Sequence, residues 1–544
     1  MIMLGSTPLT DLAPLAVLLP VLGAALTFTL VRRPRAQITV TILTLALTLV
    51  LNIGLLAVVW QTGAAAVSIG AWAPPLGVSL VVDRLSALML VISSLITLAV
   101  LLYATAQGVV DEDEGGPVSI FHPTFMILVA GVSNAFLAGD LFNLYVGFEI
   151  LLMASYVLLT LGGTGQRIRA GTTYVVVSVI SSVVFLVAIA MIYAATGTVN
   201  MADLAGKLGQ LPTDVQMVLH VMLLVGFAIK AAVFPLSFWL PDSYPTAPAP
   251  VTAVFAGLLT KVGVYALIRT ETLLFPGEHV NALLMVVAAL TMVVGILGAL
   301  AQSDLKRILS FTLVSHIGYM IFGLGLASEL GLAATVFYVA HHITVQTGLF
   351  LVTGLIENRA GTANIDRLGS LALVSPLVAV LFFIPAMNLA GIPPFSGFFG
   401  KIGLLAGGIE LATPLAWVLV AVSVVVSLMT LLVVVRAWAR AFWRRIEDVE
   451  HPPAQLVSAY QRAKTAGRRP KPLSMGLVLP TAGLVALGVA FTVFAGPLYD
   501  LSDRAAQDMI DRTPYITAVL GDVAAEQAAE DLSHDPTEEG NDGR

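Results

Sequence analysis

Long apolar runs separated by short polar segments make up most of the chain. A helix that spans a bilayer needs about 20 consecutive apolar residues. The runs that lack Asp, Glu, Lys and Arg cover residues 12–31, 37–82, 85–110, 115–139, 170–202, 279–303, 308–328, 331–356, 368–400, 411–435 and 472–499. Strands of a membrane β-barrel would instead show short segments of alternating hydrophobicity. The pattern therefore predicts an all-α polytopic membrane protein.

Three further apolar stretches carry a charged residue inside an expected span. They are about 141–162 with Glu149, 214–234 with Lys230 and 247–268 with Lys261. The run 368–400 leads into Lys401, after which apolar sequence resumes, and the run 37–82 holds one helix and a loop around Trp72 to Pro75. Together these stretches predict about 14 transmembrane helices.

Composition agrees with this class and excludes several others. Hydrophobic residues make up 58% of the 544 residues and charged residues only 11%, whereas soluble domains carry about 25% charged residues. The net charge of −6 is small and the basic residues are spread over loops, so nothing indicates nucleic-acid binding. The absence of Cys excludes disulfides, thiolate metal sites and redox dithiols.

The distribution of Lys and Arg predicts the orientation. With 14 spans and the N-terminus outside, 18 of the 27 basic residues fall in cytoplasmic loops and six outside. The other three, Lys230, Lys261 and Lys401, lie within spans. Because basic residues are retained on the cytoplasmic side, this asymmetry places both termini outside.

The charges inside spans are the first candidate functional residues. A Lys at the bilayer centre costs about 2.5–3.5 kcal/mol on insertion scales, so Glu149, Lys230, Lys261 and Lys401 need a compensating role. The default hypothesis is an ion or proton pathway. The alternative, a long side chain that reaches the membrane surface, fits Lys261 better than it fits Glu149 or Lys230.

Two of these lysines stand beside interrupted helices. Pro235 and Pro241 follow Lys230, and Gly391, Pro393 and Pro394 precede Lys401. Proline within a span frees a carbonyl that protein or water must satisfy. A kink for packing is the plain alternative. Interrupted spans at corresponding places of two halves instead indicate two inverted five-helix repeats, each containing a broken helix, with a site at the midplane.

This interpretation predicts six parts of the chain. The first three are helices 1–3 (1–110), a first inverted repeat with helices 4–8 (111–270) and a second inverted repeat with helices 9–13 (271–436). The other three are a basic cytoplasmic loop (437–473), helix 14 (474–498) and a polar C-terminal tail (499–544). We expect the tail to form an amphipathic surface segment with Leu501, Ala505, Met509 and Ile510 on one face. A disordered end from Glu526 to Arg544 is expected to follow.

Histidines add candidate proton carriers to the row. His341 and His342 lie mid-span, and imidazole exchanges protons near neutral pH. Adjacent residues point to different helix faces, so at most one of the two is expected to face a polar axis. His316 in the preceding helix is either a relay or a neutral packing residue. No ligand spacing accompanies these histidines, so no metal site is predicted.

Several segments resemble a known family in order and spacing. Residues 227–267, 302–310 and the segment GIPPFSGFFGK ending at Lys401 resemble the proton-translocating core of antiporter-like subunits. These subunits occur in respiratory complex I, membrane-bound hydrogenases and Mrp-type Na+/H+ antiporters. The resemblance implies that Glu149 of helix 5 pairs with Lys230 of helix 7. It also implies roles for Lys261 of helix 8 and Lys401 of helix 12.

One departure from the family's pattern concerns helix 11. Related subunits often have Lys four residues after a His, whereas this chain has Gln346 four residues after His342. Because Gln is not a simple acid or base, the central relay would need His341 or His342 together with water.

Within the superfamily the chain most resembles the Mrp D subunits. The lysine at 401, the length and the segment 514–521 carry this match. The resemblance implies a hetero-oligomer with the A, B, C, E, F and G subunits in a bacterial plasma membrane, no cofactor, and transport rather than enzymatic activity. Protons would pass along the row and drive Na+ efflux.

Other functions stay open at this point. The main alternative is a proton-pumping subunit of an NADH:quinone oxidoreductase or membrane-bound hydrogenase, while a purely structural scaffold conflicts with four charged spans. Asp140 and Asp242 are either oxygen ligands for Na+ or interfacial and helix-capping acids.

Overall fold

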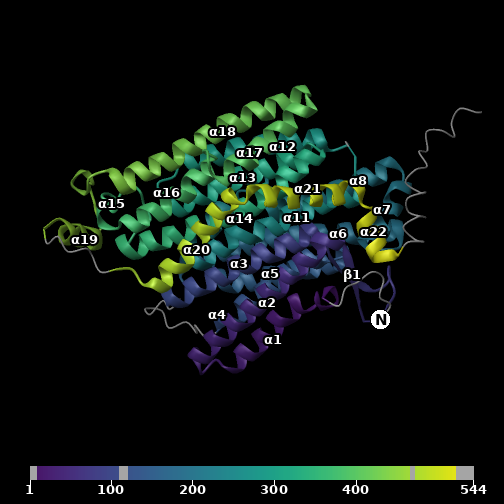
Figure 1. The fold of residues 1–544 in the computed structure, drawn as a ribbon, viewed down its shortest axis with the longest axis horizontal. Coiled ribbons are helices and arrows are strands. Elements are labelled where there is room, and N and C mark those ends of the chain that lie inside the picture. The colour runs from purple at the N-terminus through teal and green to yellow at the C-terminus, as the bar shows by residue number, and fades with distance from the viewer. Residues whose placement is uncertain (1–8, 71, 109–119, 278, 466–471, 522–544) are drawn as a thin grey trace, which may run out of the picture.

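The predicted apolar runs fold into helices that lie side by side along one direction (Figure 1). The structure is a computed structural model that describes residues 9–70, 72–108, 120–277, 279–465 and 472–521. Uninterrupted apolar helices are α1 (Leu15–Thr29), α2 (Pro34–Thr62), α3 (Arg84–Gln107), α4 (Phe121–Leu137), α5 (Leu141–Thr160), α6 (Gly165–Thr196), α12 (Asn281–Leu300), α13 (Leu305–Gly325), α14 (Glu329–Ala360), α18 (Pro414–Trp438) and α20 (Met475–Val493).

Two of the remaining spans are broken into pieces, at the places where the prolines predicted a break. α8 (Thr213–Ala231) ends just after Lys230, and the short α9 (Trp239–Ser243) and η4 (Tyr244–Thr246) follow it. α16 (Pro376–Ala390) and α17 (Ser396–Leu411) are separated by Gly391 to Phe395. In each case the residues between the pieces include prolines that cannot donate a helix hydrogen bond.

The remaining span is continuous but alternates between α- and π-helix. It consists of α10 (Ala249–Val254), the π-helix η5 (Phe255–Leu259), α11 (Thr260–Arg269) and the π-helix η6 (Thr270–Leu274). Within the described residues, 12 helices are long and apolar enough to cross a membrane, and α4 and α16 are two shorter apolar helices. Counting these two, the structure agrees with the predicted 14 spans.

Small elements mark the two ends of the bundle. Strands β1 (Ala65–Ile69) and β2 (Val78–Val82) pair antiparallel around the predicted loop, so a short hairpin is added to the all-α fold. This hairpin, α7 (Met201–Lys207) and α22 (Thr513–Leu520) lie at one end, here named the β1 end (Figure 1). α15 (Leu371–Val374) and α19 (Ala454–Thr465) lie at the opposite end, the α19 end.

A bridge between a helix-capping Asp and a distant Asn occurs twice with the same spacing. Asp140, the N-cap of α5, pairs with Asn200, and Asp304, the N-cap of α13, pairs with Asn364, so each bridge joins residues 60 positions apart. The same backbone bond flanks both bridges, because the amide after each Asp donates to the carbonyl before each Asn. The recurrence supports the predicted repeats, whose boundaries at 111–270 and 271–436 stay a prediction.

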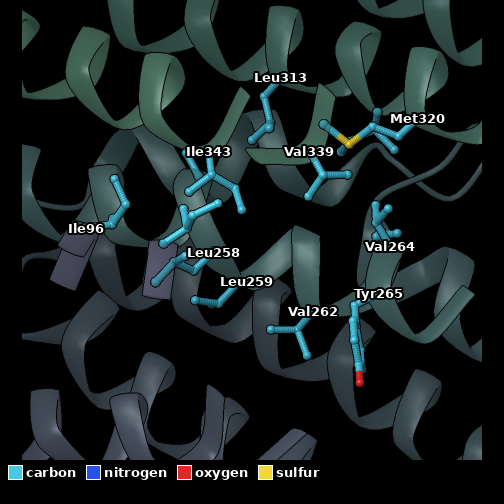
Figure 2. Close-up of a cluster of buried hydrophobic side chains, with 14 of the residues drawn as sticks. Ile96, Leu258, Leu259, Val262, Val264, Tyr265, Leu313, Met320, Val339 and Ile343 are labelled. Atoms are coloured by element: carbon cyan, nitrogen blue, oxygen red, sulfur yellow. The ribbon is translucent and has the colours of Figure 1, made fainter. Parts of the chain in front are cut away.

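The centre of the bundle is formed by α14, whose side chains are buried along most of its length. Figure 2 shows Val339 and Ile343 of this helix facing Leu258 and Val262 of the neighbouring span. Helices in lipid associate through such close packing rather than through exclusion of water. The segment that leads into Lys261 therefore packs against the central helix through apolar side chains.

The C-terminal part departs from the expectation in two respects. The predicted helix 14 ends at Val493, and the following helix α21 (Ala495–Asp511) packs along α14. Leu501, Ala505 and Met509 are buried as expected, but Ile510 is 50% exposed. Positions four apart share a helix face, whereas a residue one step further is turned by about 100°. The expected disordered end, Glu526 to Arg544, lies outside the described residues.

Candidate functional site

Glu149 and Lys230 are brought together, but through a third side chain. Ser182 Oγ on α6 donates to Glu149 Oε1, and Ser182 Oγ also accepts a hydrogen bond from Lys230 Nζ at 3.0 Å. Lys230 Nζ also donates to the carbonyl of Ser178 at 3.3 Å. The implied pairing of helices 5 and 7 is therefore relayed by a serine of helix 6.

Space for water adjoins Lys230. A cavity of about 20 Å³ is lined by Lys230, Ser178, Tyr174, Trp239 and Leu259. A water needs roughly 10–15 Å³ of such volume, so this cavity has room for about one. Its lining includes Leu259 of the π-helix η5.

Lys261 is fully buried and does not reach the membrane surface. Its exposed fraction is 0%, and Nζ donates to the carbonyl of Ala256 in the π-helix at 2.7 Å. π-Helical turns inside α-helices occur frequently at functional sites. The alternative in which Lys261 extends to the interface is therefore wrong, because the side chain folds back onto its own helix.

The helices that carry these two lysines touch each other directly. A Cβ atom added to Gly263 would lie 2.6 Å from the backbone nitrogen of Ala231. No side chain fits there, so α11 and α8 approach at backbone distance. This close contact brings the helix turns of Lys230 and Lys261 together.

A cluster of three histidines and a tyrosine continues the polar row between α13 and α14. The rings of His316 and His342 are 5.1 Å apart, and the Tyr338 hydroxyl is hydrogen-bonded to His316 Nδ1 at 2.7 Å. The ring of Tyr338 lies 5.4 Å from that of His341 and 6.3 Å from that of His342. His316 is thus part of the row, which the sequence had left open.

The expectation that at most one of the two adjacent histidines faces the polar row is wrong. Both imidazoles lie beside Tyr338, which precedes His341 by three residues and His342 by four. Positions i+3 and i+4 flank the same helix face, so both neighbours reach the same tyrosine.

Four ring nitrogens of this cluster have no hydrogen-bond partner in the described protein. They are His316 Nε2, His341 Nε2, His342 Nδ1 and His342 Nε2, all buried. An unsatisfied buried polar group costs about 1–3 kcal/mol. Such nitrogens are suited to bind water or a transferred proton.

Lys401 completes the row at the second broken helix. Its Nζ donates to the carbonyl of Ala390 at 3.0 Å and to Ser427 Oγ at 2.9 Å, and lies 4.9 Å from the ring centre of Tyr319. Ala390 is the last residue of α16, where helix carbonyls lack partners. The break therefore supplies an acceptor for the lysine, which a kink for packing would not require.

His341 of the central helix α14 is hydrogen-bonded to the second broken helix. Its Nδ1 is hydrogen-bonded to Ser396 Oγ at 3.0 Å, at the start of α17, and Ser396 in turn donates to Asn388 Oδ1 at 3.2 Å. His342 is near enough to both Lys261 and Lys401 to interact with them electrostatically. All six predicted site residues lie inside the helical bundle, and their order as one row stays a prediction.

Gln346 is buried and hydrogen-bonded, and its amide does not exchange protons as an acid or base. Its Nε2 donates to the carbonyl of Leu309 at 2.7 Å, while Oε1 has no partner within the described protein. The histidines nearby, rather than this position, offer exchangeable ring nitrogens.

The two acids considered as Na+ ligands have structural partners. Asp140 accepts from the backbone nitrogen of Asn143 at 2.6 Å as the cap of α5. Asp242 forms an exposed ion pair with Arg307 at 2.9 Å. The capping and interfacial alternative therefore fits both.

Sequence reasoning missed Ser182, Tyr338, Tyr319 and Ser396. A signal was present for two of them: Ser182 stands in an apolar helix with Ser178 and Ser181, and Tyr338 precedes the histidine pair at helical spacing. The contacts of Tyr319 and Ser396 join helices far apart in the sequence, which no local pattern marks.

Comparisons with known proteins identify the family. A sequence profile described as NADH:quinone oxidoreductase/Mrp antiporter, TM, matches residues 138–430. The Na+/H+ antiporter D subunit of Alkalihalophilus pseudofirmus is 40% identical over 476 residues, covering 87% of this chain and 92% of that protein. The chain belongs to the family of Mrp antiporter D subunits.

Solved structures agree with membership in this family. A chain of the Mrp complex from a Dietzia species has a TM-score of 0.86 and 33% identity, covering 95% of this chain and 100% of that one. A chain of respiratory complex I from Thermus thermophilus has a TM-score of 0.74 and 26% identity, with 92% and 99% covered. The chain is accordingly a multi-pass membrane protein and a transporter component.

Proposed function

We propose that this chain is the proton-conducting subunit of a multi-subunit Na+/H+ antiporter, in which inward proton flow drives Na+ export. One observation supports the proposal: the bundle contains Glu149 and Lys230 joined through Ser182, Lys261 on the adjoining helix, the histidine cluster, and Lys401 at the second break. Intramembrane ionisable groups are expensive to insert and mark ion pathways. All residues of this row fall inside the segment that matches the family profile.

The first step of the mechanism is switching at Glu149. The Ser182 hydroxyl donates to the carboxylate and accepts from Lys230, so it couples the two charges. A nearby carboxylate stabilises the ammonium form of a buried lysine. Movement of Glu149 away from Ser182 would remove that stabilisation and favour release of the lysine's proton.

Proton transfer then proceeds laterally. The proton leaving Lys230 passes through the water-sized cavity toward Lys261. From there it passes to His342 and His316, and through Tyr338 and His341 toward Lys401. Like charges in a low-dielectric interior repel strongly, so protonation of one site promotes release at the next, and each proton taken up at one end is matched by one released at the other.

Partner subunits and lipid cover the outer surface in this proposal. Large apolar side chains such as Leu43 and Val50 of α2, Val183 of α6 and Leu428 of α18 are more than half exposed. Such surfaces suit a bilayer or other membrane subunits. The partners are the A, B, C, E, F and G subunits in a bacterial plasma membrane, and the β1 end faces outside.

A redox-pump subunit is the competing function. It is disfavoured because the identity to the two Mrp relatives is higher than that to the complex I chain. An experiment that separates the two uses everted vesicles from an antiporter-deficient bacterium and compares this chain alone with the chain and its neighbouring gene products.

Lys401→Ala in the full set is the decisive variant, and Lys464→Ala is its matched control. Lys464 forms an exposed ion pair with Glu447, far from the row. We expect Na+-dependent dequenching with the full set and with the control, and its loss in Lys401→Ala. Acidification driven by NADH or hydrogen without any Na+ response would instead assign the chain to a redox pump.

A further inference from the structure

A second buried ionisable pair lies outside the row. His220 Nε2 of α8 is 2.7 Å from Glu271 Oε1 of the π-helix η6, and each side chain is only 6% exposed. The imidazole also stacks on the ring of Phe275 at 4.4 Å, nearly parallel. A buried ion pair is weak evidence for a stabilising role, since desolvation offsets much of its attraction.

This pair bridges the same two helices that carry Lys230 and Lys261. His220 precedes Lys230 by ten residues on α8, and Glu271 follows Lys261 by ten residues on α11 and η6. The helices run antiparallel, because Gly263 meets Ala231 near the lysines while Glu271 meets His220 further along. At 1.5 Å per residue the pair lies about 15 Å from the lysines, toward the β1 end.

One cavity adjoins each member of this pair. One of about 150 Å³ is lined by His220, and a second of about 150 Å³ is lined by Glu271. Pro276 and Gly277 line both cavities and are exposed at the surface. Each cavity has room for several waters, so the pair stands between two regions that solvent can reach.

Few other charges face the pair. His279 and Arg512 line the His220 cavity, and Arg512 Nη1 donates to the Leu273 carbonyl at 3.5 Å. Arg269, two residues before Glu271, is engaged in a buried ion pair with Asp83. Among the described residues that line the second cavity, Glu271 is the ionisable one.

We propose that His220 and Glu271 form the proton-loading pair at the β1 end, which takes a proton from water in these cavities and passes it along α8 and α11 toward the lysines. This proposal rests on the proposed antiport function. The proton binds the carboxylate or the imidazole, is shared across their hydrogen bond, and leaves to a water on the inner side. No other reactant is needed.

The test uses the complete antiporter in proteoliposomes, with the Na+-driven proton flux measured against pH on each side. Glu271→Gln retains shape and can still accept a hydrogen bond from His220, but it cannot carry a proton. We expect Glu271→Gln and His220→Gln each to reduce the flux by about tenfold or more. The double variant should be no worse than either single variant, because the pair acts as a unit.

Recovery by the conservative variant distinguishes proton transfer from a structural role. Glu271→Asp keeps the carboxylate and should restore most of the flux and its dependence on pH at the β1 end. Glu271→Gln with the normal flux and pH profile would overturn the proposal. A normal Glu271→Gln variant would not overturn the proposed antiport function, provided that the wild-type complex shows antiport and Lys230→Ala abolishes it.

Chemical labelling tests which side loads the pair. The chain contains no Cys, so Thr213→Cys, at the exposed lining of the His220 cavity, gives a single reactive position. We expect a membrane-impermeant maleimide to label it in right-side-out vesicles, with the unsubstituted complex as the background control. Labelling only in everted vesicles would overturn loading from outside.

Discussion

The hydroxyl oxygen of Ser182 lies 3.0 Å from the amine nitrogen of Lys230. Because the same hydroxyl donates to Glu149, the charge pair of this antiporter subunit is coupled through a group that can reorient. Removal of the hydroxyl would separate the charges without removing either one, which makes this serine a sharper probe than the charges themselves.

Ser182→Ala should reduce Na+-driven proton flux by about tenfold or more, because the carboxylate and the lysine lose their connecting hydrogen bonds. Ser182→Thr keeps a hydroxyl and should retain most of the flux. Ser181→Ala is the matched control, since Ser181 donates to the Gly226 carbonyl instead. The measurement is fluorescence dequenching in vesicles that contain the full complex, and a normal flux in Ser182→Ala would contradict the coupling.

Glu149→Ala and Lys230→Ala should each abolish antiport while the complex still assembles. Burial of either charge costs insertion energy, so its removal leaves the helices able to pack. Co-purification of the other subunits measures assembly, and vesicle assays measure flux. Near-normal antiport by assembled variants would refute the role of this pair.

Tyr338→Phe tests the link between the histidines. The variant loses the hydrogen bond to His316, which is worth about 0.5–1.5 kcal/mol in stability. We expect a small decrease in the melting temperature but a large loss of flux, because the relay is interrupted. Tyr193→Phe, at a position that is 57% exposed, should alter neither quantity. Equal effects of both substitutions on the flux would contradict a role for Tyr338 in proton transfer.

Gly263→Ala should force apart the helices that carry Lys230 and Lys261. Its Cβ would lie 2.6 Å from backbone of α8, and such overpacking costs about 1–3 kcal/mol. Thermal unfolding in detergent should therefore occur at a lower temperature. Gly483→Ala has no atom within 4 Å of the added Cβ and should be neutral, so an unchanged melting temperature for both would contradict the close contact.

The spans and the broken helices could be predicted from the chain alone, and so could the charged residues that lie inside spans. Each depends on neighbouring residues: an apolar run long enough for a bilayer, a proline after Lys230, a charge where hydrocarbon would surround it. Charges buried in lipid are costly enough that their positions are informative even without a partner.

The partners of those charges depended on the fold. Ser182 lies 33 residues from Glu149 and 48 from Lys230, and Glu271 lies 51 residues from His220. Helix packing, not local sequence, decides which side chains meet across such separations. Hydropathy therefore locates each helix and its unusual residues, whereas only the packed bundle decides their partners, because a hydrogen bond requires contacts of about 3 Å.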